Sequence, residues 1–572
     1  MNKIIRFSVF AVFILLSAVS MYMGFYAEEL IEALAEKIGS DGDSEKIKSF
    51  LTGEKIQLLF GFSTLVALST GFLFLFRFER ITNLWNSFLQ EFYQKLRGLK
   101  SAVSTREALT VTSIILVHLA LSIYHASQIP VTNDEAFTYL NYVNRGFVAA
   151  FAFYNEPNNH ILYSLLANCS DLLSFMDISW RLRLPSLIIG AVSTFSFYWL
   201  FRKLYGIKRA QIFTIVWIGL FLVAKYHFLA RGYGLMMLSF ITAFYALISL
   251  KEDPQSTFAK GFFICSMFIG LYAHPTFVIP LIALIIYSWS DREIQITSIL
   301  KLLIPAVFLT VIFYAPPIIL NGFEAFTQNS GLEKPSFLRL LKEIGENIWG
   351  VVYQTSYNSP FASGVVTGLA IVSIISNRKL AGTRLFFFSL ISILLVLIAA
   401  GSPMFTRNLL WLTVPIVMLI AQIVKDNYLA PKMRFNIVFA FVAILFFTVR
   451  AFFFKPTFDI YYERLQPAYD FADALPAEYG ELFFTNTTYH YTILKYKANL
   501  IDHKKGTLQR TDFDPSMKYN FIVNEKEKDQ AFHQKSQFDY TSYYEDDWVS
   551  VWALSNKKRY NENIAPLSKI FG

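Results

Sequence analysis

The chain alternates between long apolar stretches and short polar connections. A helix needs roughly 20 mainly apolar residues to cross the hydrocarbon core of a bilayer, and about thirteen stretches approach that requirement. They lie near residues 7–26, 56–76, 109–127, 184–201, 210–225, 234–250, 261–274, 275–290, 297–316, 361–376, 384–400, 409–424 and 434–453. The first is longer than the apolar region of a secretion signal and no cleavage motif follows it. We therefore interpret it as a membrane anchor.

The pattern changes after residue 454. Residues 455–572 carry 15 basic and 17 acidic residues, with no stretch long enough to cross a membrane. Apolar runs at 481–486, 519–523 and 548–554 are typical of strands, and 468–475 is typical of a helix. The sequence thus predicts a polytopic α-helical membrane protein with a small C-terminal α/β domain. We expect three parts: an N-terminal transmembrane hairpin (1–108), a membrane domain (109–454) and the α/β domain (455–572).

Composition supports this fold class. The hydrophobic residues make up 54% of the 572 residues and the charged ones only 16%, whereas soluble chains carry roughly 25% charged residues. A soluble enzyme needs a more polar surface than this chain can supply. The two cysteines, Cys169 and Cys265, exclude a disulfide framework and a cysteine-rich zinc site.

The placement of charge predicts the topology. Segment 27–55 has eight acidic and four basic residues, and segment 77–106 has six basic and two acidic residues. Cytoplasmic connections are enriched in Lys and Arg, so we expect the first outside, the second inside and the N-terminus in the cytoplasm of a plasma or inner membrane. Alternation then places these basic connections inside: 202–209, 251–260, 290–295, 377–384 and 425–434. This topology explains the net charge of +9 without a nucleic-acid partner.

One apolar stretch, 161–177, decides the later topology. Counting it as a further span would move the later basic connections outside. It contains Asn168 and Asp171, which are costly at the centre of a bilayer. We therefore predict an interfacial helix on the outer surface, and the alternation places the C-terminal domain outside the cytoplasm.

Polar residues gather on the predicted outer side. They comprise Asp134 and Glu135, then Glu156, Asn158, Asn159 and His160, then Arg181 and Arg183, then Lys225, His227 and Arg231, and finally His274 and Arg407. A carboxylate at the membrane surface can accept the proton of an attacking hydroxyl, and basic side chains can hold a lipid-linked phosphate. The set suits group transfer from a phosphate-linked lipid.

Each of these residues also has a structural interpretation. Asp134 and Glu135 can cap a helix, and Asn159 and His160 can form a turn. The outer arginines, Lys225 and His227 can act as interfacial anchors, and His274 can end a helix before Pro275.

The ordered series is more specific than its parts. It consists of the acidic pair, Asn159-His160 with Tyr163, Arg-x-Arg-x-Pro-Ser (181–186), LARGYGL, GLYAHPTF and RNLL. It resembles the GT-C superfamily of integral-membrane glycosyltransferases, across roughly residues 109–424. The nearest likeness is to protein O-mannosyltransferases, lipid A aminoarabinose transferase and lipopolysaccharide-core sugar transferases. Ile161 and Leu162 replace two prolines of one family motif, and Gly232, Tyr233 and Gly234 stand where relatives often have an acidic residue.

The resemblance implies an inverting transferase that moves a monosaccharide from a polyprenyl-phosphate donor at the outer face. The acceptor would be a lipid, glycan or protein. Asp134 matches the catalytic base, with Glu135 beside it. The expected phosphate contacts are Arg231, Arg407, Lys225 and Arg181. The expected substrate contacts are Asn159, His160, Tyr163, His227 and His274.

Several alternatives remain at this stage. No redox cofactor is required, and the carboxylates and histidines permit a divalent metal ion without requiring one. A transporter or flippase of a lipid-linked glycan would be expected to carry ionisable groups at mid-membrane depth, and we expect none here. A non-catalytic scaffold presenting the C-terminal domain is the other alternative.

Segment 317–360, with Glu324, Glu333 and Lys334, is expected to be a lid.

Overall fold

The structure is a computed structural model. It describes residues 2–38, 47–48, 50–154, 159–327, 335–377, 380–402, 404–424, 426–429, 431–462, 465–484, 488–509, 516–525, 534, 537–545 and 549–555. Glu156, Asn158, Glu333 and Lys334 lie outside these residues. The chain forms two compact units, one from residues 1–126 and 141–454 and the other from residues 127–140 and 455–572.

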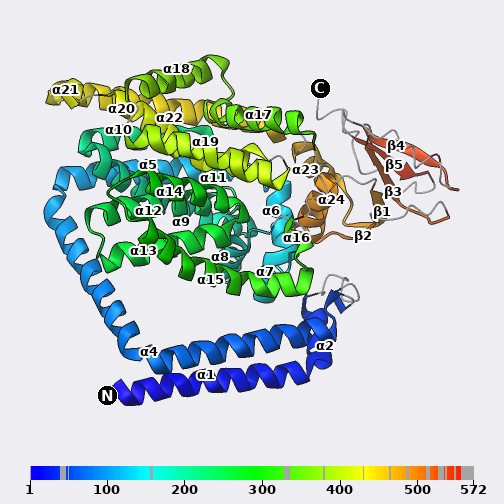
Figure 1. The fold of residues 1–572 in the computed structure, drawn as a ribbon. Coiled ribbons are helices and arrows are strands. Elements are labelled where there is room, and N and C mark those ends of the chain that lie inside the picture. The colour runs from blue at the N-terminus through cyan, green and yellow to red at the C-terminus, as the bar shows by residue number, and fades with distance from the viewer. Residues whose placement is uncertain are drawn as a thin grey trace. The chain divides into compact units, whose positions relative to one another are not determined.

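The first unit is helical (Figure 1). Its long helices are α1 (Asn2–Phe25), α4 (Gly53–Ala102), α5 (Thr105–Gln128, ending in the second unit), α9 (Ile178–Tyr205), α12 (Tyr233–Glu252), α13 (Thr257–Ala273), α15 (Ile296–Asn321), α17 (Phe337–Thr355), α18 (Pro360–Ser376), α19 (Ala381–Ala400) and α22 (Lys432–Tyr462, also crossing the boundary). Shorter ones are α2 (Ala27–Ile38), α7 (Phe147–Ala152), α8 (Ile161–Asp171), α10 (Ile207–Gly219), α11 (Phe221–Tyr226), α14 (Val278–Ser290), α16 (Glu324–Thr327), α20 (Thr413–Ile423) and α21 (Asp426–Leu429). Short segments of other helix types are η1 (Tyr139–Val143, crossing the boundary between the units), η2 (Pro275–Phe277) and η3 (Thr406–Leu412).

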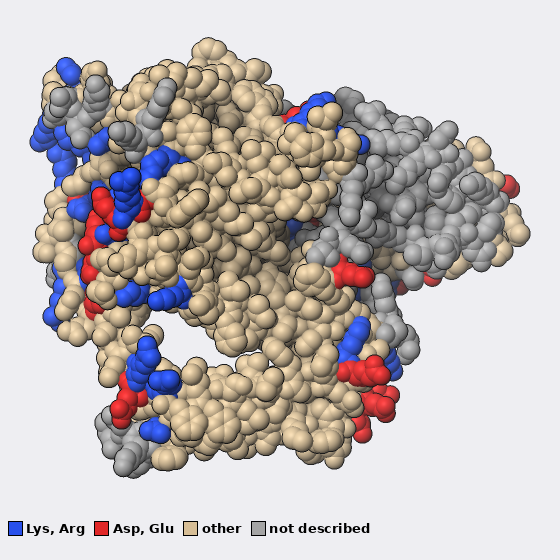
Figure 2. Space-filling view, viewed as in Figure 1, with Lys and Arg blue, Asp and Glu red and all other residues tan. Residues whose placement is uncertain are grey.

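The chain is a membrane protein by the length and composition of its helices. Among the described residues, nine helices are long and apolar enough to cross a membrane, or ten if the bent pair α17–α18 forms one span. The nine coincide with predicted stretches 7–26, 56–76, 109–127, 184–201, 234–250, 297–316, 384–400, 409–424 and 434–453, and these predictions are confirmed. In Figure 2 the charged side chains of this unit gather near helix ends, and a broad uncharged surface separates them.

The other four predicted stretches are apolar helices of a different kind. Stretches 261–274 and 275–290 correspond to helices shorter than a usual span, and 361–376 is the second half of the pair bent by 110°. Stretch 210–225 is divided between α10 and α11, because Leu220 is extended. The Arg450 guanidinium donates to the Ile218 carbonyl (3.1 Å) and the Tyr357 hydroxyl to the Gly219 carbonyl (2.8 Å). These bonds satisfy carbonyls that a helix ending inside apolar surroundings would leave unpaired.

Segment 161–177 is not a full span. Its helix α8 has 11 residues, which at 1.5 Å per residue covers about half of the hydrocarbon core. The interfacial placement that the topology requires stays a prediction, and a helix of this length is compatible with it.

The basic segment 77–106, which the sequence predicts as an inside connection between spans, is mostly helical. Helix α4 bends at Arg77 and continues to Ala102. The second half packs on α13, where Glu91 accepts hydrogen bonds from the backbone amides of Thr257 (2.9 Å) and Phe258 (3.0 Å). A carboxylate at a helix N-terminus is stabilised there, so the contact explains why the helix continues.

The segments predicted to be cytoplasmic are joined to one another. Arg202 pairs with Glu107 (2.6 Å), and Lys251 and Arg384 both pair with Asp291 (3.1 Å each). Burial raises the pKa of Asp291, but hydrogen bonds from Lys251, the Glu293 backbone and Arg384 leave that pKa below its usual range. The ion pairs place these basic connections on one face, as alternation requires.

The second unit contains a five-stranded sheet in the order β2-β1-β3-β5-β4. The strands are β1 (Glu478–Phe484), β2 (Lys505–Gln509), β3 (Phe521–Glu525), β4 (Tyr540–Glu545) and β5 (Val549–Leu554), and the helices are α6 (Asn133–Thr138), α23 (Leu465–Ala474), α24 (Thr488–Leu494) and η4 (Lys495–Ile501). Strand β1 pairs in parallel with β2 and β3, whereas β5 pairs antiparallel with β3 and β4. Phe471 and Leu475 pack with Leu482, Val523 and Val551 to form the core. The predicted α/β character of this region is confirmed.

Candidate functional site

A buried cluster forms where the helices of the first unit end opposite the ion-paired face. Helix α8 begins after His160, α12 begins at Tyr233, and α13 ends before His274. The His160 ring lies 4.8 Å from the His274 ring and 4.9 Å from the Tyr233 ring, centroid to centroid. Three segments that are far apart in the sequence therefore converge at one place.

Two arginines accompany these rings. Arg231 is 4% exposed, and its guanidinium lies 5.8 Å from the centroid of Tyr233. Burial lowers the pKa of His160 well below its usual range, and the positive charges of Arg231 and Arg407 lower it further. His160 is therefore uncharged near neutral pH, and the two arginines supply the positive charge. We name His160, Arg231, Tyr233, His274 and Arg407 the arginine–histidine cluster.

The backbone around the cluster is tightly fitted. A Cβ on Gly232 would lie 2.9 Å from both the Ala273 carbonyl oxygen and the His160 Cβ. A Cβ on Gly190 would lie 2.8 Å from the His227 Cβ, and one on Gly234 would lie 2.9 Å from the Tyr226 carbonyl oxygen. These close approaches explain the RGYG sequence, since a larger residue at position 232 would separate the loops.

The imidazole of His160 has a buried nitrogen without a hydrogen-bond partner among the described residues. The His160 Nε2 is buried and makes no hydrogen bond there, while the ring hydrogen-bonds the backbone of Ala273. The His274 Nδ1 instead accepts from the Thr276 amide at 3.2 Å. Because buried polar atoms are usually satisfied, the Nε2 is suited to a hydroxyl or phosphate oxygen of a ligand.

Other predicted site residues have structural partners. Asn159 donates to the Phe153 carbonyl (2.6 Å) and accepts from the Ser164 hydroxyl (2.6 Å), so it fixes the turn before α8. The Tyr163 hydroxyl donates to the Leu182 carbonyl at 2.8 Å. Arg181 pairs with Asp171 at 2.9 Å.

Lys225 and His227 lie on α11 and at its end. Lys225 is 6% exposed and its ammonium group lies 5.5 Å from the Tyr226 ring centroid. His227 Nδ1 lies 2.9 Å from His118 Nε2, and the other ring nitrogen of His118 contacts Arg450. His227 thus belongs to a second buried group, which also holds the broken end of α10.

This second group corrects one expectation. Mid-membrane ionisable residues were not expected, yet His118 lies within α5 and Arg450 within α22, both fully buried. The sequence carried a signal for this group, namely a single His and a single Arg in long apolar runs. An ionisable residue in such a run indicates a buried partner. Arg450 contacts His118, the Ser122 hydroxyl and backbone carbonyls, which give it a structural role.

The acidic pair belongs to the second unit. Thr132 and Glu135 form a capping box at the start of α6, in which the Glu135 carboxylate accepts from the Thr132 amide at 2.8 Å. Glu135 is fully buried, whereas Asp134 is half-buried. Helix α6 packs against α24, and the Tyr469 hydroxyl donates to the Val131 carbonyl at 2.9 Å. The C-terminal domain therefore holds the segment that carries Asp134.

The expected lid contains a helix beside Arg407. Helix α17 packs on η3, and Thr406 donates to the Asn347 side chain at 2.9 Å. Gly350 allows this approach, because a Cβ there would lie 2.9 Å from the Thr406 hydroxyl. Among the described residues, no group of three or more His, Cys, Asp or Glu side chains is arranged to hold a metal ion.

Comparison with known proteins gives structural matches. Neither a protein-family model nor a curated protein matches the sequence. The structure is similar to ArnT from Cupriavidus metallidurans in the apo state, with 12% identity, a TM-score of 0.35, and coverage of 78% of this chain and 97% of that one. It is also similar to that enzyme bound to undecaprenyl phosphate, with 10% identity, a TM-score of 0.37, and coverage of 77% and 97%.

A third match is the oligosaccharyltransferase of Archaeoglobus fulgidus tethered with an acceptor peptide. It shares 11% identity with a TM-score of 0.39, and the match covers 78% of this chain and 74% of that one. ArnT and this oligosaccharyltransferase are both GT-C family members.

Proposed function

We propose that this protein is an inverting membrane glycosyltransferase that uses a polyprenyl-phosphate sugar. The observation that carries the proposal is the arginine–histidine cluster, in which two arginines and the unpartnered His160 Nε2 meet where α8, α12 and α13 begin or end. Arginine binds phosphate oxygens through paired, charge-assisted hydrogen bonds. The cluster is suited to hold a lipid-linked phosphate at the membrane surface.

The proposed reaction needs three roles. The acceptor hydroxyl oxygen attacks the anomeric carbon, and the bond from that carbon to the phosphate oxygen breaks. Asp134 accepts the hydroxyl proton, and the polyprenyl phosphate leaves with the bonding electron pair. Arg231 and Arg407 stabilise the charge that builds on the phosphate, and neutral His160 binds a sugar hydroxyl or a phosphate oxygen.

The finer assignments are part of the same proposal. Lys225 assists the arginines, and His274 shapes the sugar pocket. Arg181, Asn159, Tyr163 and His227 position these groups through the contacts described above. Transfer takes place at the outer face, the N-terminus lies in the cytoplasm, and the acceptor is a lipid, a glycan or a protein. The parts proposed from the sequence, 1–108, 109–454 and 455–572, serve as hairpin, membrane domain and outer domain.

The test is release of polyprenyl phosphate by the purified full-length protein. The protein is incubated with undecaprenyl-phosphate sugars and with extracted cell-envelope acceptors, and products are measured by mass spectrometry. We expect at least one donor to lose its sugar to an acceptor, and Arg231→Ala to slow the transfer. Movement of a lipid-linked glycan across the membrane of proteoliposomes, with no sugar transferred to any acceptor, would instead indicate a transporter.

A further inference from the structure

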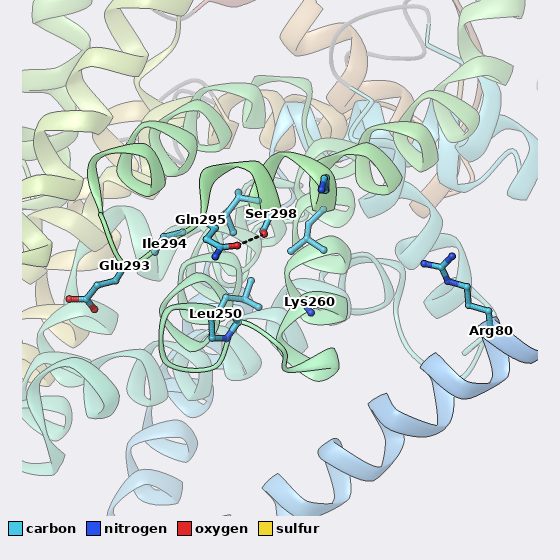
Figure 3. Close-up of a pocket in the computed structure, with 11 residues that line it drawn as sticks. Arg80, Leu250, Lys260, Glu293, Ile294, Gln295 and Ser298 are labelled. Carbon is cyan, nitrogen blue, oxygen red and sulfur yellow. Dashed lines mark hydrogen bonds between the residues drawn. The ribbon is translucent and has the colours of Figure 1, made fainter.

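A cavity of about 420 Å³ lies on the ion-paired face, away from the arginine–histidine cluster. Residues from α4, from the α12–α13 connection and from the start of α15 line it, as Figure 3 shows. Its polar lining consists of Arg80, Lys260, Lys301, Glu293, Gln295 and Ser298. Three cations and one carboxylate therefore face a single cavity.

The positive charge of this cavity is available to a ligand. Glu293 pairs with Lys251 at 3.2 Å. Within the part of the chain that the structure describes, Arg80 and Lys301 form no hydrogen bond or ion pair. Lys260 makes only contacts of 3.4 Å with Gln255. Gln295 and Ser298, which bond each other at 3.3 Å, add neutral hydrogen-bonding groups.

The helices that carry the unpaired cations continue as apolar surfaces. On α15, Lys301 is followed by Ile304, Phe308 and Val311, each at least 60% exposed. Their spacing of three and four residues puts them on one face of the helix. On α4, Phe76 and Leu73 are exposed beside Arg80. Figure 2 shows an opening between α4 and the helices above it, with a mostly uncharged rim and basic side chains at one side.

We propose that the cavity binds the headgroup phosphate of an anionic glycerophospholipid. The phosphate contacts Arg80, Lys260 and Lys301, and the acyl chains lie along the exposed faces of α4 and α15. Basic pockets beside membrane helices recognise anionic headgroups in this way. The charge complementarity and the adjoining apolar faces favour a lipid over a soluble phosphate. This site is separate from the proposed transfer reaction and does not depend on it.

The test is native mass spectrometry of the full-length protein in detergent, titrated with phosphatidylglycerol and with phosphatidylcholine of the same acyl chains. We expect the anionic lipid to bind at least tenfold more tightly. Because each surface cation contributes roughly a fivefold preference for an anionic lipid, Arg80→Ala with Lys301→Ala should weaken phosphatidylglycerol binding by about thirtyfold. Binding of phosphatidylcholine should not change.

The matched control replaces Arg97 and Lys432 by Ala. Both are exposed on segments of the same face and lie outside the cavity lining, so binding should stay within about threefold of wild type. If the Ala pair fails to fold, Arg80→Gln with Lys301→Gln is used instead. Added salt should weaken the binding of phosphatidylglycerol to the wild type and leave the other combinations of lipid and protein unchanged.

Four results would overturn the proposal. Equal affinity for the two lipids indicates ordinary solvation by bilayer lipid. Equal loss in the test and control variants indicates that the face attracts anionic lipid without a site. Displacement by inorganic phosphate indicates a site for the free anion, and displacement by stoichiometric undecaprenyl phosphate assigns the cavity to the donor lipid.

Discussion

The two adjacent carboxylates differ in what they contact. The Glu135 side chain completes the capping box with Thr132, whereas Asp134 is half-buried one position along. Both residues lie on the same short helix, and in the sequence only the family resemblance assigned the base to Asp134. The capping box supplies the distinction, because a carboxylate engaged with a backbone amide is poorly placed to accept a proton from a substrate.

We expect Asp134→Asn to lower the transfer rate by roughly 10²- to 10⁴-fold, because it removes the base while keeping the shape. Glu135→Gln should cost less than about fivefold, since Gln also serves in capping boxes. Initial rates at saturating donor measure both variants. The assignment is wrong if Glu135→Gln is inactive and Asp134→Asn retains the wild-type rate.

The two arginines should act on the donor phosphate. A hydrogen bond to a charged group contributes roughly 1.5–3 kcal/mol, so Arg231→Ala or Arg407→Ala should reduce transfer by roughly tenfold to a few hundredfold. Lys should restore only part of the rate, because it lacks the planar fork. Arg292→Ala serves as a comparison, since Arg292 is exposed and lies outside the cluster. Wild-type rates at limiting donor for both Ala variants would show that these arginines do not bind the phosphate.

At the scale of elements, the loops around the cluster depend on close backbone approach. The motif RGYG places Gly232 against Ala273 and His160, which come from two other segments. The sequence predicted which segments meet on one side, since alternation of spans follows from apolar length. It could not predict the contact itself, which depends on packing between distant segments.

We expect Gly232→Ala to destabilise the protein by about 1–3 kcal/mol, because the added methyl group overpacks the contact, and to reduce transfer at the same time. Gly364→Ala is the matched control, since a Cβ there meets nothing within 4 Å. Thermal unfolding in detergent and transfer rates are measured for both. Equal stability and activity of the two variants would contradict the described packing.

The broken helix shows where sequence reasoning failed. Stretch 210–225 has the composition of a span, but Arg450 and Tyr357 bind the carbonyls at the end of α10 and allow the chain to turn. These partners lie far away in the sequence, so an apolar count could not detect the break. Helix α4 is the opposite case. Apolar length did not indicate that its polar second half is helical, yet contacts with α13 stabilise that half.

At the scale of the whole molecule, the topology remains a prediction that can be tested directly. After Cys169 and Cys265 are replaced by Ala, a single cysteine at Arg292 should resist a membrane-impermeant thiol reagent in intact cells, and one at Lys518 should react. Both positions are exposed, so a reagent that reaches their side of the membrane can modify them. Reversed labelling would place the proposed site residues on the cytoplasmic side.

The fold class was largely predictable, whereas the place of residues 127–140 was not apparent from the sequence. Apolar length predicted nine spans that the structure contains, and strand-like runs predicted three strands of the C-terminal sheet. Residues 127–140, however, form a unit with the C-terminal domain. The contacts of α6 with α24 and of Tyr469 with Val131 join segments more than 300 residues apart, and no local pattern encodes them.

The most direct test of the proposed transfer is mass spectrometry of cell-envelope lipids and glycans from cells with the wild-type gene, a deletion and Asp134→Asn. The deletion and the variant should both lack one monosaccharide on one glycoconjugate and accumulate the matching polyprenyl-phosphate sugar. Membrane levels of the variant, measured by immunoblot, should equal those of the wild type. A complete glycoconjugate in the Asp134→Asn cells, or no change in any envelope glycan on deletion, would contradict the account.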